Sequence, residues 1–215
     1  MNNNSNSFDA LIFDLDGTLI DSAPDVRASI NRVLVGMGRR ELTLEETKDM
    51  VGWGGRVLAE KALAKTGDAG TSSDIDRTLE GFLTTYAQHP ADHSVVYPGV
   101  LSMLDGFKAA GVRMGLCTNK PTATTPPVLE ALGLSQYFDV VSCGDTVPYS
   151  KPDGRQVLRV VEAFGTTIET TAINADMRSV AVTFGYAHVP CDELGADALI
   201  DHFDDLVQAL ADIAP

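Results

Sequence analysis

The stretch FDLDGTLI, residues 13–20, places two carboxylates, Asp14 and Asp16, directly after the apolar run Ala10–Phe13. Such a run is typical of a buried strand, and ligands of parallel α/β sheets bind beyond the carboxyl ends of the strands. Neighbouring carboxylates repel each other unless a cation lies between them, and Mg²⁺ prefers oxygen ligands of this kind. We therefore expect a Mg²⁺ cradle, with Gly17 allowing a sharp turn that brings backbone N–H groups to a phosphate. The alternative is a solvated turn in which an aspartate caps a helix.

The composition is that of a soluble, acidic protein. Its 215 residues are 44% hydrophobic, enough for a real core, and its net charge is −14. A surface this acidic disfavours nucleic acid and anionic membranes as partners, and no apolar run reaches transmembrane length. Three widely spaced cysteines suit a reducing cytoplasm better than a disulfide framework. The polar, uncharged residues 1–7 are predicted to be a disordered leader and not a signal peptide.

Apolar strand-like runs alternate with helical patterns along most of the chain. After the first run, the predicted strands span residues 112–117, 140–143, 180–184 and 198–200. Helical spacing predicts helices over residues 100–110, 123–132 and 155–164, each ended by the glycine that follows it. This alternation predicts an α/β fold with a Rossmann-like parallel sheet covered by helices on both faces.

Residues 22–93 interrupt the alternation, because no strong strand pattern occurs there. Helical spacing predicts helices over residues 26–37, 44–51, 56–66 and 75–87. We therefore expect a small α-helical cap, residues 22–93, inserted after the first strand. Residues 8–21 and 94–215 would then form the α/β core.

A second polar string follows the predicted strand 112–117. Thr118 stands at its end, beside the next predicted helix, and Asn119 and Lys120 follow. A hydroxyl at a strand end near a helix N-terminus is well placed to bind phosphate, although it can also simply cap the helix.

The string FDLDGTLIDSAPD closely resembles the opening motif of the haloacid dehalogenase superfamily in its phosphatase branch. Its SAPD continuation is similar to that of the phosphoglycolate phosphatase group, and the resemblance extends from about Phe8 to Leu206. It implies that Asp14 is the nucleophile and Asp16 the general acid/base, which protonates the leaving oxygen and then activates water against the aspartyl phosphate. Dehalogenases proper lack the second aspartate, so Asp16 favours phosphoryl chemistry.

The same resemblance implies roles for further residues. Thr118, in the string TNKP, and Lys151, in the string KPD, would hold the transferring phosphoryl group. Lys151 would also pair with the nucleophile. Gly17, Thr18 and Asn119 would line the substrate site. The implied cofactor is Mg²⁺, held by the two aspartates of the opening motif.

The family's fourth motif, GDSxxD, should supply one more metal carboxylate, but no GD pair occurs in residues 170–180. Counted back from Gly185, the chain is short by about ten residues, close to three helical turns. Either Asp176 is the motif aspartate and the helix after it is lost, or residues 175–177 end that helix and the strand with its motif is lost. We favour the second alternative, because the match from Met177 onward then needs no gap. It predicts weak Mg²⁺ binding, impaired turnover and a sheet that lacks a strand.

The helical insertion resembles the cap of this branch, which closes over the site and carries selectivity. In its loop 51–56, Arg56 either meets a substrate carboxylate or is a surface arginine at a helix start.

These inferences predict a Mg²⁺-dependent phosphatase of small phosphomonoesters, with 2-phosphoglycolate the leading substrate, in the cytoplasm and as a monomer or homodimer. One alternative is a phosphosugar mutase of the same superfamily, whose motif usually continues with GV instead of Gly17-Thr18. Another is a non-catalytic relative that binds a phosphorylated ligand or a partner, which only the short segment before Val180 favours.

Overall fold

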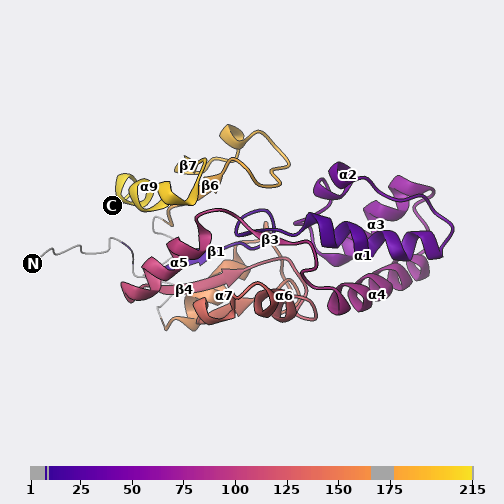
Figure 1. The fold of residues 1–215 in the computed structure, drawn as a ribbon, viewed down its shortest axis with the longest axis horizontal. Coiled ribbons are helices and arrows are strands. Elements are labelled where there is room, and N and C mark those ends of the chain that lie inside the picture. Colours follow the sequence, from indigo (N-terminus) through magenta and orange to yellow (C-terminus); the bar gives the residue numbers. More distant parts are fainter. Residues whose placement is uncertain (1–7, 9, 166–176, 215) are drawn as a thin grey trace, which may run out of the picture.

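The computed structural model describes residues 8, 10–165 and 177–214. The predicted leader, residues 1–7, lies outside the described residues, and so does Asp176. A group of helices formed by residues 22–93 projects from one end of an α/β core, as Figure 1 shows. This arrangement confirms the predicted α/β class. Among the described residues, no helix combines the length and the apolar character needed to cross a bilayer.

The core sheet has three parallel strands in the order β1-β4-β5, which are β1 (Ala10–Phe13), β4 (Arg113–Cys117) and β5 (Val140–Ser142). Phe13 pairs with Leu116, and Cys117 pairs with Ser142, so the carboxyl ends of the three strands meet at one edge. The loops that leave this edge carry the polar strings singled out in the sequence.

Both faces of this sheet are covered, because its side chains alternate between two apolar clusters. The helices around it are α5 (Val100–Ala109), α6 (Thr125–Ala131), α7 (Arg155–Ala163) and the 3₁₀ helix η1 (Ser135–Tyr137). Met114 and Leu116 join the main cluster, whereas Cys117 packs with Val160 of α7 on the other face. At Gly115 the approach of α7 leaves no room for a side chain, since a Cβ would lie 2.4 Å from Val160.

The C-terminal part forms a second parallel sheet with its own helix. Its elements are β6 (Val180–Val182), β7 (Ala198–Ile200), α9 (Leu206–Asp212) and the 3₁₀ helices η2 (Cys191–Glu193) and η3 (Phe203–Asp205). Ile200 and Phe203 belong to the main apolar cluster, so this unit packs on the core. Within the described part of the chain, however, β1 pairs only with β4, and β6 pairs only with β7. Among the described residues, the single sheet expected from the alternation is therefore seen as two separate sheets.

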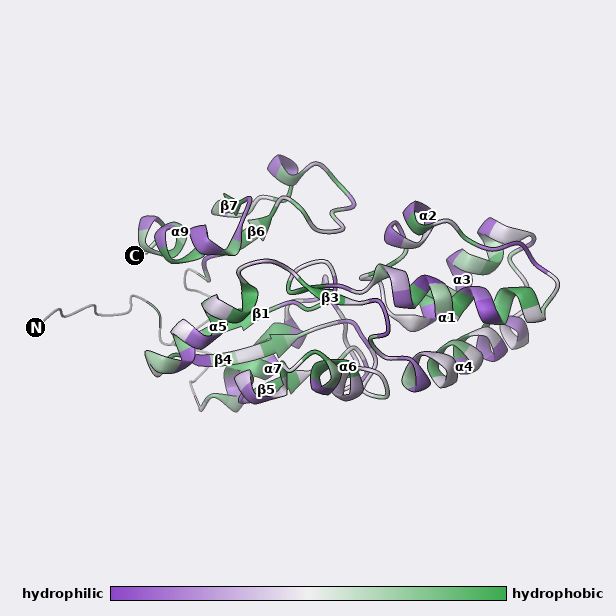
Figure 2. Ribbon diagram, viewed as in Figure 1, coloured by the Kyte–Doolittle hydropathy of each residue, from purple (hydrophilic) through white to green (hydrophobic). Residues whose placement is uncertain are grey.

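The projecting segment contains four helices, α1 (Ala23–Gly36), α2 (Leu44–Lys48), α3 (Gly55–Thr66) and α4 (Ser72–Gln88). We call it the cap. Thr43 and Thr71 begin α2 and α4 with complete capping boxes, which satisfy the first backbone donors of each helix. Figure 2 shows apolar and polar patches on the same helices. The apolar faces of α1, α3 and α4 meet around Ile30, Leu63 and Phe82, all of which are buried.

Two short strands, β2 (Ile20–Asp21) and β3 (Val95–Val96), pair antiparallel where the chain enters and leaves the cap. The buried Asp25 carboxylate strengthens this junction. It accepts hydrogen bonds from the backbone N–H groups of His93 and Ser94 and from the Ser94 hydroxyl, the last at 2.6 Å. The first helix of the cap is thereby fastened to the second connection.

Candidate active site

Asp14 and Asp16 follow β1 in a tight loop at the carboxyl edge of the core sheet. The fully buried Leu15 and Leu19 hold the loop in place. Gly17 turns the chain with φ of 77°, a left-handed conformation that other residues rarely adopt. The Asp14 Oδ1 atom accepts the N–H of Leu15 at 2.7 Å, which fixes one oxygen of this carboxylate.

Lys151 lies against Asp14, with 2.6 Å between its Nζ atom and Asp14 Oδ1. The same ammonium donates to the carbonyl of Cys117, the last residue of β4, at 2.9 Å. The backbone N–H of Lys151 is held by Asn119 Oδ1 and by Gln156 Oε1, each at 2.9 Å. The structure therefore brings the predicted nucleophile and the predicted phosphoryl-binding lysine into direct contact.

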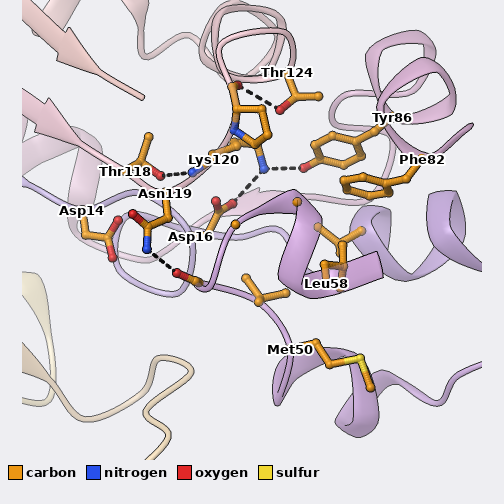
Figure 3. A pocket seen from close by; sticks show the side chains of 16 residues that line it. Asp14, Asp16, Met50, Leu58, Phe82, Tyr86, Thr118, Asn119, Lys120 and Thr124 are labelled. Atoms are coloured by element: carbon orange, nitrogen blue, oxygen red, sulfur yellow. Dashed lines mark hydrogen bonds and ion pairs between the residues drawn. The ribbon is translucent and has the colours of Figure 1, made fainter. Parts of the chain in front are cut away.

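Thr118 continues β4 into the same site. Its N–H donates to the carbonyl of Ser142 on β5, and its own carbonyl accepts from the Gln156 amide at 2.8 Å. Its buried hydroxyl accepts the N–H of Lys120 at 3.1 Å. The residue lines the same cavity as Asp14 and Asp16 (Figure 3).

Asn119 connects three segments of the site. Its Nδ2 atom donates to the carbonyl of Gly52 in the cap at 2.8 Å and to the carbonyl of Lys151 at 2.9 Å. A second contact between cap and core lies nearby, where His188 bonds the Val51 carbonyl through Nε2 at 3.0 Å. The cap loop is thus held against the core. Because both polar ends of the Asn119 side chain are engaged, its position favours a connecting role, and its predicted substrate contact stays a prediction.

Lys120 forms a buried ion pair with Asp16, at 3.0 Å between Nζ and Oδ1. Its ammonium also donates to the Tyr86 hydroxyl, on cap helix α4, at 2.9 Å. Burial acts to lower the pKa of Lys120, but the Asp16 charge and the Tyr86 oxygen outweigh it, and the pKa is raised above its ordinary value. Lys120 is therefore a cation at neutral pH.

Gly17 and Thr18 line the same groove as Asp14 and Asp16, whereas Arg56 lies away from it. The N–H groups of Gly17 and Thr18 already donate to the carbonyls of Ile20 and Leu15, so these donors are used within the loop. Arg56 lies on the outside of α3, where it pairs with acidic side chains on the helix surface, and it lines neither of the cavities next to Asp14. Phosphate binding by the loop and carboxylate binding by Arg56 stay predictions.

Two hollows meet at Asp14 and Asp16. The first, about 40 Å³, lies between cap and core, and its cap wall includes apolar residues such as Leu58 and Phe82. The second, about 500 Å³, is a more open groove that runs from the β1 loop past Lys151 to β6. The two aspartates are therefore accessible from both hollows.

The described residues do not form a complete set of metal ligands. Within that part of the chain, no three side chains of the His, Cys, Asp and Glu types gather closely enough to hold an ion. Asp16 Oδ1 is engaged by Lys120 and Ser22, which leaves Asp14 as the more exposed carboxylate. The predicted ligand Asp176 falls outside the described residues. The described residues would thus supply only part of the Mg²⁺ site that the sequence predicts.

Residues 11–178 match the family described as haloacid dehalogenase-like hydrolases. The chain belongs to this family. It is 38% identical to a phosphoglycolate phosphatase of Agrobacterium fabrum over 211 residues, covering 93% of this chain and 91% of the relative. A phosphoglycolate phosphatase of Caulobacter vibrioides is 35% identical over 211 residues, with 93% and 89% covered.

Solved structures agree with this assignment. The crystal structure of a predicted phosphoglycolate phosphatase from Haemophilus somnus has a TM-score of 0.86 and 26% identity, covering 94% of this chain and 97% of that one. The comparisons confirm the resemblance inferred from the opening motif and the class of enzyme, a hydrolase similar to phosphoglycolate phosphatase.

Tyr86 and Lys120 are two of the site residues that sequence reasoning did not assign. Lys120 stands in the TNKP string, but nothing in its local pattern says that its partner is Asp16. Tyr86 follows Phe82 at helical spacing, which is typical of a buried apolar face. One signal in the sequence was the position of Lys120 just after the predicted buried strand 112–117. A lysine that is buried there requires a partner for its ammonium group.

Proposed function

We propose that this protein is a phosphatase of small phosphomonoesters, with 2-phosphoglycolate as its leading substrate. The observation that carries the proposal is the 2.6 Å contact between Lys151 and Asp14 beside Asp16 and Thr118. Relatives with the name phosphoglycolate phosphatase support the choice of substrate. The small volume under the cap also favours a short leaving group.

In the first step, a carboxylate oxygen of Asp14 attacks phosphorus, and the bond from phosphorus to the ester oxygen breaks. Asp16, which holds the proton taken from water in the preceding turnover, gives it to that oxygen, and the oxygen leaves as an alcohol. The Lys151 ammonium offsets negative charge that develops on the phosphoryl oxygens, and the Thr118 hydroxyl donates a hydrogen bond to one of them.

In the second step, Asp16 takes a proton from water while the water oxygen attacks phosphorus. The bond between phosphorus and Asp14 breaks, phosphate leaves, and Asp14 is again a carboxylate. The cap wall of the smaller hollow would shield the leaving-group side of the site from bulk water.

The family's enzymes generally use Mg²⁺, and we extend that requirement to this chain. The Asp14 carboxylate and the Asp16 backbone carbonyl would hold the ion, and the ion would supply positive charge for the phosphoryl oxygens. Because the described residues offer only these two ligands, water would complete the coordination, so binding is proposed to be weak.

In the test, purified protein is incubated with Mg²⁺ and with either 2-phosphoglycolate or 4-nitrophenyl phosphate. The released phosphate is measured. Wild-type protein and the control Asp212→Asn, which removes an equal charge from the distant helix α9, should release phosphate, whereas Asp14→Asn should not. Release that survives Asp14→Asn would overturn the assignment of the nucleophile. When a phosphosugar is offered in a parallel reaction, transfer of the phosphoryl group from one sugar hydroxyl to another without release would indicate a mutase.

A second candidate is a phosphorylated-ligand binding protein without turnover. The feature that favours it is in the sequence, where residues 170–180 contain no GD pair. In that case wild-type protein would release no phosphate, but 2-phosphoglycolate would still raise its melting temperature.

A further inference from the structure

The buried ammonium of Lys120 is the most tightly enclosed cation near the site. Its side chain is 5% exposed, and it lies at the boundary between the core and the cap. A charge in such a place is stable only when it is paired. Asp16 provides the countercharge, and the Tyr86 oxygen accepts a further hydrogen bond at 2.9 Å.

These contacts fix one oxygen of Asp16. Oδ1 receives the Lys120 ammonium at 3.0 Å and the Ser22 hydroxyl at 2.5 Å. Among the residues that the structure describes, Oδ2 has no hydrogen-bond partner. Two donors on Oδ1 set the rotation of the carboxyl group and leave Oδ2 as the oxygen that can exchange a proton with a ligand.

Tyr86 carries this arrangement into the cap. It lies on α4, is fully buried, and stacks on Phe82 one helical turn earlier, with 5.5 Å between ring centroids. The Lys120 ammonium also lies 4.4 Å from the centre of its ring (Figure 3). Because α4 belongs to the cap and Lys120 to the core, the ammonium keeps this partner only while the cap is seated.

We propose that Lys120 is a positioning residue that orients the Asp16 carboxyl group for proton transfer, and that Tyr86 makes this orientation depend on cap closure. The inference rests on the proposed phosphatase function. It assigns to the cap a part in assembling the proton donor, in addition to covering the site.

The kinetic test compares leaving groups, because a proton donor matters for an alkoxide and little for a nitrophenolate. Single-turnover release of glycolate from 2-phosphoglycolate should fall about 100-fold in Lys120→Met, within the range for general acid catalysis. Tyr86→Phe should lower it about 10-fold, the effect of one hydrogen bond. Single-turnover release of 4-nitrophenol from 4-nitrophenyl phosphate, which reports the first step alone, should change less than threefold in both, a limit of about 0.6 kcal/mol.

The control is Lys65→Met, which removes an exposed lysine from α3 and should leave both reactions unchanged. Equal losses for the two leaving groups would mean that Lys120 only maintains the fold, and would overturn the inference. Unchanged glycolate release in Lys120→Met would overturn it as well.

A second measurement does not depend on turnover. Tyr86→Phe and Asp16→Asn, singly and together, are compared by their urea unfolding midpoints. The two effects should be non-additive when Lys120 is present and additive in the Lys120→Met background. Additivity in both backgrounds would overturn the proposed link. If wild-type protein releases no phosphate, the proposed function is wrong. The unfolding midpoints would still show whether Lys120 couples Tyr86 of the cap to Asp16.

Discussion

Gly17→Ala tests whether the loop that carries the two aspartates has the geometry described above. The substitution places a Cβ atom 2.6 Å from Cδ2 of Tyr186 and 3.0 Å from its backbone nitrogen. The ring cannot simply turn away, because its hydroxyl donates to Asp21 and accepts the N–H of Ala23 at 3.0 Å. Alanine must also adopt the positive φ of 77°.

Two costs therefore combine at this position. The left-handed backbone costs about 1–2 kcal/mol for a residue with a Cβ atom. Overpacking against Tyr186 adds about 1–3 kcal/mol. In total, the free energy of unfolding should fall by about 2–5 kcal/mol. The matched control is Gly133→Ala, which has φ of 68° and no atom within 4 Å of the new Cβ, so it carries the backbone cost alone.

Urea unfolding followed by circular dichroism measures the difference between the two variants. With a slope of about 2 kcal/mol per molar urea, Gly17→Ala should unfold at a concentration about 0.5–1.5 M lower than Gly133→Ala. Phosphate release should also fall, because the loop cannot hold both aspartates in place. Equal midpoints for the two variants would refute the close approach of residues 185–186 to the loop.

Three further results are expected. Chelation of divalent ions with EDTA should abolish phosphate release and added Mg²⁺ should restore it, with half-saturation in the millimolar range; full activity in EDTA would exclude the proposed cofactor. Burial, with a smaller contribution from the charge of Asp21, raises the pKa of Tyr97 to about 12, so the fold favours its neutral form. The contribution of Tyr97 to stability should therefore be complete below the ordinary tyrosine pKa and should be lost as the pH rises from 10 toward 12. Tyr97→Phe should make the fall of the urea midpoint between pH 8 and 11 less steep, and the part that remains belongs to the other buried tyrosines, such as Tyr86 and Tyr186. Burial also raises the pKa of Cys117 to about 11, so iodoacetamide at neutral pH should label the partly exposed Cys191 and spare Cys117 until urea unfolds the chain, as peptide mass spectrometry would show.

Much of the fold could be predicted because its signals are local. The apolar runs at residues 10–13 and 198–200 are strands with the predicted bounds, and the helices of the cap begin and end within a few residues of expectation. Glycines that follow the helices, such as Gly111 and Gly133, have the positive φ that ends a helix.

The parts that sequence reasoning missed depend on distant partners. The two-residue strands β2 and β3 form because Ile20 pairs with Val96, and the whole cap lies between these two residues in the sequence. A run of two residues is too short to predict such a pairing. The helix α9 was not predicted either, since its apolar pattern is short. In the site, the contact of Lys151 with Asp14 was expected from the family motif. The contact of Lys120 with Tyr86 was not, because α4 and the TNKP string meet only in the folded chain.

The central claim is that Asp14 attacks phosphorus. It is tested most directly in Asp16→Asn, which should accept a phosphoryl group from 4-nitrophenyl phosphate but release it slowly. After an acid quench, peptide mass spectrometry should find the phosphoryl group on Asp14, and the double variant Asp14→Asn, Asp16→Asn should carry none. A phosphoryl group on another residue, or wild-type turnover with Asp14 never modified, would contradict the account.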